Sequence, residues 1–186
     1  MKKILVINGS PSGKKGNCAR FISSLPKLNA AKLSVVHLAN ESYSSAFKKE
    51  IAKADGFVFV TGTYWDSWGS PLQKLLEDMT DLEGTEAIMG KPAAVFVLMH
   101  SVGGKGVLSR LQGVLSTFGC LIPPMSGMVY SLVSDIALSK KNSHAADFWQ
   151  KEDAELILLN LIKASEIKID WADWPVDKKD PRRLWL

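Results

Sequence analysis

A loop of small and polar residues follows the first apolar run of the chain, and its composition suits anion binding. The run Ile4–Ile7 is followed by Asn8–Cys18, which carries three glycines, two serines and two asparagines before a helix-like pattern begins. Backbone N–H groups, serine and asparagine side chains and the positive end of a helix dipole favour an anion at such a place. The loop therefore predicts a phosphate site.

The glycine spacing separates this loop from two common phosphate motifs. Gly9, Gly13 and Gly16 do not fit the G-x-G-x-x-G pattern of dinucleotide-binding folds. A P-loop needs four residues between its glycines and then Lys-Ser or Lys-Thr. Here three residues separate Gly9 from Gly13, and Lys15 follows Lys14. Neither motif fits, and an ordinary strand–helix turn without a ligand stays open as the alternative.

Two further loops end apolar runs and carry aromatic and polar side chains or glycines. The segment 61–74 follows the buried run 56–60 and reads Thr-Gly-Thr-Tyr-Trp-Asp-Ser-Trp-Gly-Ser-Pro-Leu-Gln-Lys, and 99–106 reads Met-His-Ser-Val-Gly-Gly-Lys-Gly. Because the aromatic residues of the first of these loops lie among Thr, Asp and Ser, they favour a wet cleft over the core. Trp68 has three open interpretations: it covers a ligand, lines a substrate face or packs against the sheet.

Composition bounds the class of protein. A chain of 186 residues with 46% hydrophobic and 23% charged residues is typical of one soluble globular domain. No apolar run approaches the roughly 18 residues of a membrane span, and no signal pattern precedes the first strand. Cys18 and Cys120 have no metal-ligand spacing and form no disulfide framework. We therefore expect a cytoplasmic protein that acts at no membrane and holds no metal.

The charge of the chain is positive but scattered. The net charge is +4 and the pI is about 9.0. The lysines form separate pairs rather than a stripe with interleaved aromatics, which argues against nucleic acid as a partner.

Short apolar runs alternate with amphipathic stretches, which is the pattern of βαβ units in a parallel sheet. Strands are expected at 3–7, 33–38, 56–60, 93–99 and from 121–122, resuming at 128–132. Helices are expected at 17–28, 44–53, 70–82, 106–118 and 145–167. This matches a flavodoxin-like doubly wound α/β fold with three αβα layers and strand order 2-1-3-4-5. In such a sheet a ligand lies beyond the carboxyl ends of strands one, three and four, where the three loops begin.

The last stretch of the sequence differs from the rest. We expect a domain over residues 1–170 and a basic tail over 171–186 that holds three of the six tryptophans. So many tryptophans are unusual for a free disordered end. The tail is expected to pack on its own domain or on a second subunit.

The three loops together resemble those of the flavodoxin-like NAD(P)H-dependent FMN reductase family. The first matches its Gly-Ser-Pro-x-x-x-x-Gly-Asn pattern over residues 9–17. The second matches the family's signature at Tyr64, at Pro71 with Leu72, and at Lys74, and the third matches its glycine-rich loop. The resemblance covers about residues 2–124 and implies FMN as cofactor and NAD(P)H as reductant.

The resemblance also implies roles for particular residues. The phosphate of FMN would be held by Ser10, Ser12, Gly16, Asn17 and Cys18. The flavin ring and ribityl chain would contact Thr63, Tyr64, Trp65, Asp66 and Ser67, and the pyrimidine edge would contact His100, Ser101, Gly103 and Gly104. No catalytic residue is assigned with certainty, although Tyr64 and His100 are candidates, and His100 equally suits a plain strand end. His37 and His144 are placed away from the loops and given no role.

The resemblance implies an oxidoreductase that passes a hydride from NAD(P)H through flavin to a small acceptor. Quinones, free flavins, azo or nitro compounds and metal ions all remain open as acceptors. Relatives commonly form dimers, so a homodimer or homotetramer is expected. The alternative is an FMN-binding electron-transfer or redox-sensing module without NAD(P)H turnover, and a scaffold that has lost FMN is a third.

Overall fold

One parallel sheet forms the centre of the molecule. The computed structural model describes residues 1–138 and 149–174, and its five strands lie in the order β2-β1-β3-β4-β5. The strands are β1 (Lys2–Asn8), β2 (Ala31–His37), β3 (Gly56–Gly62), β4 (Ala93–Met99) and β5 (Gly127–Ser131). This confirms the expected doubly wound fold and its strand order.

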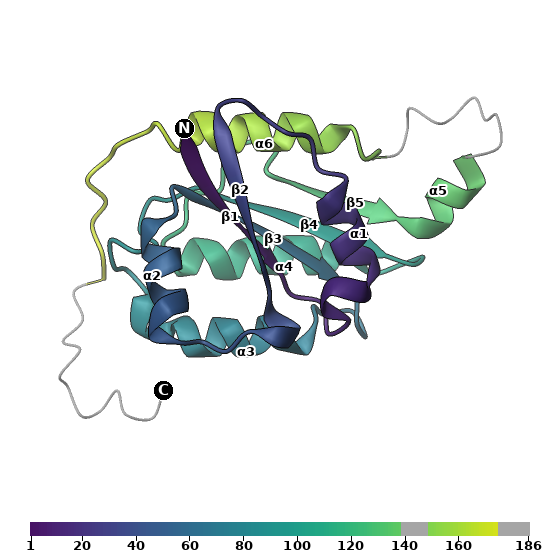
Figure 1. The fold of residues 1–186 in the computed structure, drawn as a ribbon, viewed down its shortest axis with the longest axis horizontal. Helices are drawn as coiled ribbons and strands as arrows, with labels where there is room; N and C mark the ends of the chain where they lie inside the picture. The colour runs from purple at the N-terminus through teal and green to yellow at the C-terminus, as the bar shows by residue number, and fades with distance from the viewer. Residues whose placement is uncertain (139–148, 175–186) are drawn as a thin grey trace.

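Helices cover both faces of the sheet (Figure 1). One face packs against α2 (Ser45–Lys53), α3 (Ser70–Asp78) and α4 (Gly104–Thr117), and the other against α1 (Asn17–Ser23) and α6 (Asp153–Ala164). β1 shows why two cores form, since Leu5 and Ile7 enter the first core while Ile4 and Val6 enter the second. Side chains alternate across a strand, so a strand that is apolar on both sides must lie between two layers.

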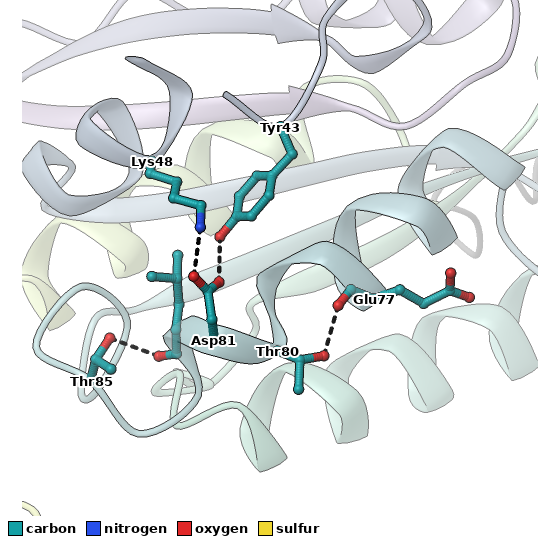
Figure 2. Close-up of polar contacts among 7 residues, drawn as sticks. Tyr43, Lys48, Glu77, Thr80, Asp81 and Thr85 are labelled. Carbon is teal, nitrogen blue, oxygen red and sulfur yellow. Dashed lines mark hydrogen bonds and ion pairs between the residues drawn. The ribbon is translucent and has the colours of Figure 1, made fainter. Parts of the chain in front are cut away.

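A small polar network joins α2 to the 3₁₀ turn Met79–Leu82 that follows α3. Figure 2 shows Lys48 and Tyr43 both reaching the carboxylate of Asp81, with Lys48 Nζ at 2.6 Å and the Tyr43 hydroxyl donating at 2.9 Å. The hydrogen bond from Lys48 is the main reason that the pKa of Asp81 lies below its usual value. Because the ion pair is exposed, it contributes little stability, and its effect is to fix where α2 lies.

Two helices are shorter than the sequence pattern predicts. The first helix was expected to reach residue 28, but α1 ends at Ser23, where the Ser24 hydroxyl donates to the Phe21 carbonyl and Pro26 follows. The helix expected over 70–82 is α-helical only to Asp78, and the rest is the 3₁₀ turn. At the end of α1 a side-chain hydrogen bond and a following proline stop the helix, and apolar periodicity does not show such features.

The region after β5 also differs from expectation. A short helix, α5 (Leu132–Leu138), begins at once after the strand, because the Ser131 hydroxyl accepts from the Ser134 N–H at 3.2 Å and acts as its cap. The final helix was expected over 145–167, whereas α6 covers Asp153–Ala164. Residues 145–148 of that expectation lie outside the described residues. Among the described residues, no helix is both long and apolar enough to span a membrane.

Candidate functional site

The first loop is folded around the side chain of Asn8, the last residue of β1. Asn8 is fully buried, its amide oxygen accepts from the Ser10 N–H at 3.0 Å, and its amide nitrogen donates to the Gly13 carbonyl at 3.0 Å. Gly13 has φ of +52°, a conformation that favours glycine. The loop is therefore held in one shape by a side chain from the sheet.

Ser10 connects this loop with the second one. It is buried, its hydroxyl lies 3.0 Å from the Tyr64 hydroxyl, and it accepts from the Ser12 N–H at 3.2 Å. Cys18 lies beneath it at the start of α1. Burial raises the pKa of the Cys18 thiol to about 11, which a hydrogen bond with Ser10 partly opposes, so the group is a neutral thiol at pH 7. The structure thus brings Ser10, Ser12, Cys18 and Tyr64 together as the sequence predicts.

The backbone of the first loop is tightly packed against its surroundings. A Cβ on Gly16 would lie 2.6 Å from that of Ser12, and one on Gly9 would lie 2.6 Å from that of Leu72 in α3. Gly69, just before α3, packs against the Gly9 carbonyl, and its N–H donates to the buried Thr61 hydroxyl at 3.0 Å. Asn17 lies exposed at the first position of α1. At Gly9, Gly16 and Gly69 the packing leaves no room for a side chain.

The second loop contains a two-residue turn in an unusual conformation. Tyr64 and Ser67 exchange both backbone hydrogen bonds, at 2.8 and 2.9 Å, and the two residues between them have positive φ, 48° for Trp65 and 57° for Asp66. Non-glycine residues in this region are strained, at a cost of about 1–3 kcal/mol each. The Trp65 side chain is nonetheless fully exposed among the residues that the structure describes.

The second and third loops meet at Gly103. This residue has φ of +84° and lies against the Asp66 carboxylate and the Thr63 methyl group, where a Cβ would collide with Asp66. Thr63 donates its N–H to the Leu98 carbonyl at 2.9 Å, yet its hydroxyl is buried and has no hydrogen-bond partner in the described part of the chain. Buried polar atoms are nearly always satisfied, so a polar ligand atom is expected beside Thr63.

The rest of the third loop is arranged differently. His100 and Ser101 are exposed, and the His100 carbonyl accepts from the Val133 N–H at the start of α5. Gly104 is buried against Val129 of β5, so its lack of a side chain serves packing as well as any ligand. The structure places these residues at the same edge of the sheet as the other two loops.

One residue that the sequence analysis set aside belongs to the site. His37 was placed away from the loops, which is wrong: its Nδ1 lies 2.9 Å from the amide nitrogen of Asn8. The parallel register pairs Asn8 with His37 across β1 and β2, and this pairing, invisible to periodicity, brings them together. Thr61 and Gly69 were also missed, although both stand within the second loop. His144 lies outside the described residues.

Trp68 is partly buried against the hydrophobic core, with contacts to α3 and α4, and its covering a ligand or lining a substrate face stays a prediction. Its indole N–H donates to Gln73 at 2.9 Å, and the Arg110 guanidinium lies 5.8 Å from its ring centre. It also borders a groove of about 520 Å³ that continues from Tyr64 and Pro11.

The described part of the tail lies at the opposite end of the sheet, where the strands begin (Figure 1). Trp171 packs over Gly90 and Asp173 over Gly84, both of which have positive φ. Residues 171–174 line a groove of about 720 Å³ there, together with Cys120. The rest of the predicted tail, 175–186, lies outside the described residues.

Several solved structures share this fold at low sequence identity. RosB, solved with bound 8-demethyl-8-formylriboflavin-5'-phosphate, is 14% identical with a TM-score of 0.70, covering 97% of this chain and 93% of RosB. The NADH:FMN oxidoreductase EMOB is 18% identical with a TM-score of 0.62, covering 86% and 89%. FerB from Paracoccus denitrificans, a flavoenzyme NAD(P)H:(acceptor) oxidoreductase, is 19% identical with a TM-score of 0.55, covering 89% and 94%.

No curated protein matches the sequence. Residues 2–131, by contrast, match the family described as NADPH-dependent FMN reductase. This match spans well over half of the chain and includes all five strands and all three loops. The chain therefore belongs to the NADPH-dependent FMN reductase family.

Proposed function

We propose that this protein is an FMN-dependent oxidoreductase that passes reducing equivalents from NADH or NADPH to a small acceptor. Family membership supports FMN as cofactor and NAD(P)H as reductant. The observation that carries the proposal is the buried hydroxyl of Thr63, which has no protein partner among the described residues and lies where the second and third loops meet. An orphaned polar atom at the carboxyl ends of parallel strands fits a ligand in that crevice.

The residues present fit FMN. In this proposal Ser10, Ser12, Gly16, Asn17 and Cys18 hold the phosphate, and a Cβ on Gly16 would collide with Ser12 and crowd the Ser10 hydroxyl. Thr63, Tyr64, Asp66, Ser67 and Gly103 hold the ribityl chain and the ring, and Trp65, His100, Ser101 and Gly104 stand at the rim. When bound, FMN supplies hydride acceptance and donation at its N5 atom.

In this scheme the residues of the chain bind FMN and orient it and the acceptor. Ser10 is held in place by Asn8 and Tyr64, and its hydroxyl would turn to the phosphate from this fixed position. Because Tyr64 is tied to Ser10, its role is to set the distance between phosphate and ring sites. His100 is exposed at the rim, where an imidazole could give a proton to a reduced quinone. A quinone is accordingly the acceptor we favour, and free flavins, azo or nitro compounds and metal ions are the others.

The decisive experiment titrates flavin-free protein with FMN and with FAD and then adds NADH or NADPH without oxygen. We expect FMN to bind more tightly than FAD, because the loop is built for one phosphate, and its absorbance at 450 nm to bleach on addition of nicotinamide. With one domain and no dinucleotide motif, donor and acceptor share one flavin face, so double-reciprocal plots at several quinone concentrations should be parallel. Tighter binding of FAD would contradict the site.

A second candidate function is tested by the same experiment. An electron-transfer or redox-sensing module would bind FMN and leave it oxidised in excess NADH and NADPH. Such a result would support FMN binding and contradict the proposed NAD(P)H-dependent activity.

The phosphate loop has its own test. Replacing Ser10 and Asn17 by Ala removes two charge-assisted hydrogen bonds, each worth about 1.5–3 kcal/mol, so FMN affinity should fall at least about tenfold while riboflavin affinity barely changes. Ser23→Ala is the matched control, because that hydroxyl donates to the Ala19 carbonyl at the other end of α1. Equal losses for FMN and riboflavin would mean that the loop holds something other than phosphate.

A further inference from the structure

The amide of Asn8 forms three hydrogen bonds, and its two sides are not interchangeable. The oxygen accepts from the Ser10 N–H, while the nitrogen donates to the Gly13 carbonyl and lies 2.9 Å from His37 Nδ1. Turning the amide over would set oxygen against the Gly13 carbonyl and nitrogen against the Ser10 N–H. Since Asn8 is fully buried, no water can repair either mismatch cheaply.

The contact with Asn8 fixes the protonation state and the tautomer of the His37 imidazole. An amide nitrogen only donates, so Nδ1 of His37 must accept and carry no proton. The ring is then neutral, with its hydrogen on Nε2. A protonated ring would turn an N–H toward the amide N–H and push Asn8 out of the orientation that serves Ser10 and Gly13.

We propose that His37 is a positioning residue for the FMN phosphate, acting through Asn8 to hold the first loop in its binding shape. The inference rests on the proposed function, because it takes phosphate as the ligand of that loop. Neutral His37 keeps the amide oriented, and protonation of His37 loosens the loop and weakens phosphate binding. His37 acts in this scheme through its contact with Asn8, and its effect is on affinity.

Burial and the charge of a nearby lysine lower the pKa of His37. Burial is the main cause that lowers the pKa of His37 below its ordinary value of 6.5, and Lys14 of the 3₁₀ turn Gly13–Lys15 lowers it further. Glu41, which follows the 3₁₀ turn Leu38–Asn40, opposes them. Because the folded-state pKa is depressed, the neutral form is secure at neutral pH and is lost only as the pH falls below the ordinary value. The loss of affinity is therefore expected on the acidic side.

The test compares two substitutions that differ in one property. His37→Gln keeps an acceptor for Asn8 but cannot titrate, whereas His37→Leu has no acceptor. Dissociation constants for FMN and riboflavin are measured by flavin fluorescence from pH 8 to pH 5. At pH 8 we expect His37→Gln to bind FMN within about twofold of the wild type and His37→Leu to bind it about fivefold more weakly, the value of one hydrogen bond.

The pH dependence of FMN affinity distinguishes the positioning role from a merely structural role of His37, which would leave this dependence unchanged. The phosphate of FMN itself gains a proton at about pH 6, and this weakens FMN binding to every variant equally. The wild type should therefore lose more FMN affinity than His37→Gln on acidification, with no such difference for riboflavin. Superimposable profiles, or unchanged FMN binding by His37→Leu at pH 8, would overturn the inference.

A measurement without flavin separates this inference from the proposed function. The ¹⁵N spectrum of flavin-free wild-type protein should show His37 with its proton on Nε2 and a bare Nδ1 at pH 7. The Ser10 amide should exchange with solvent faster in His37→Leu than in His37→Gln. A proton on Nδ1 would refute the positioning role even if FMN binds. Absence of FMN binding to the wild type would instead refute the proposed function.

Discussion

At the scale of single residues, the two cysteines make the stability of the folded protein depend on pH in the alkaline range. Burial raises the pKa of Cys18 to about 11 and that of Cys120 to about 12, from an ordinary value of 9.0. Below pH 9 both thiols are neutral whether the chain is folded or not, and the stability linked to them is fully present. As the pH rises from 9 through the folded values, only the unfolded chain ionises, so that stability is lost.

We therefore predict that the free energy of unfolding falls between pH 9 and pH 11 by about 2–3 kcal/mol for Cys18 alone. Urea unfolding at pH 8, 10 and 11 measures it in the wild type and in Cys18→Ala. The alanine variant starts from a lower stability because of its cavity, so only the change with pH is compared. Equal slopes in the two proteins would show that Cys18 ionises as easily folded as unfolded.

Sequence reasoning can nominate a site residue when its type and its position in a loop after a strand are enough to suggest a role. Ser10, Thr63 and Gly103 lie in the three loops that follow apolar strands, and the structure places these loops at one edge of the sheet. The link between Asn8 and His37 escaped because it depends on how two strands pair, which single-strand periodicity does not specify. Which side chain faces which across strands is decided by the whole sheet.

At the scale of elements, the turn from Tyr64 to Ser67 stores strain at the rim of the site. Trp65 contributes no packing to offset its positive φ, because its side chain is fully exposed. Strained residues often persist at binding sites because they preset a ligand geometry. An exposed indole beside the proposed flavin site suits stacking on a flat aromatic acceptor.

Trp65→Gly should raise the free energy of unfolding by about 1 kcal/mol, because glycine adopts positive φ without a steric cost. The same variant should raise KM for a quinone several-fold and leave KM for ferricyanide, which cannot stack, unchanged. Trp65→Asn is the control, since Asn tolerates positive φ while lacking the ring. A loss of stability in Trp65→Gly, or equal changes in KM for both acceptors, would contradict this reading.

The elements themselves were largely predictable, and their ends were not. The strand expected at 93–99 is observed with those bounds, because a continuous apolar run buried on both faces has one interpretation in an alternating chain. α5 was missed because a serine cap and a contact with the His100 carbonyl start it, where the pattern predicted strand up to residue 132. Capping and tertiary contacts set boundaries that periodicity cannot show.

At the scale of the whole molecule, apolar side chains remain exposed on the outer face of α6. Leu156 and Leu159 lie one turn apart there and are 54% and 42% exposed. We propose a homodimer or homotetramer in solution, because burying such a ridge against a second copy removes apolar surface from water.

Sedimentation velocity at micromolar concentration should show a species larger than 20.4 kDa. Replacing Leu156 and Leu159 by Glu should shift the protein toward the monomer if α6 is the interface, and Glu155→Lys on the same helix is a control for charge alone. A wild type that sediments as a monomer would remove the oligomer from the proposal.

The central place of β1 has a consequence for protein synthesis. Its four apolar residues, Ile4–Ile7, are all buried in the finished sheet, and both neighbours, β2 and β3, come later in the chain. A nascent chain therefore carries an apolar strand with both edges unpaired until β2 has been made, and with one edge unpaired until translation has passed Gly62 and β3 is complete. During that interval we expect ribosome-associated chaperones to bind this segment. At high expression levels the same segment is where aggregation would begin.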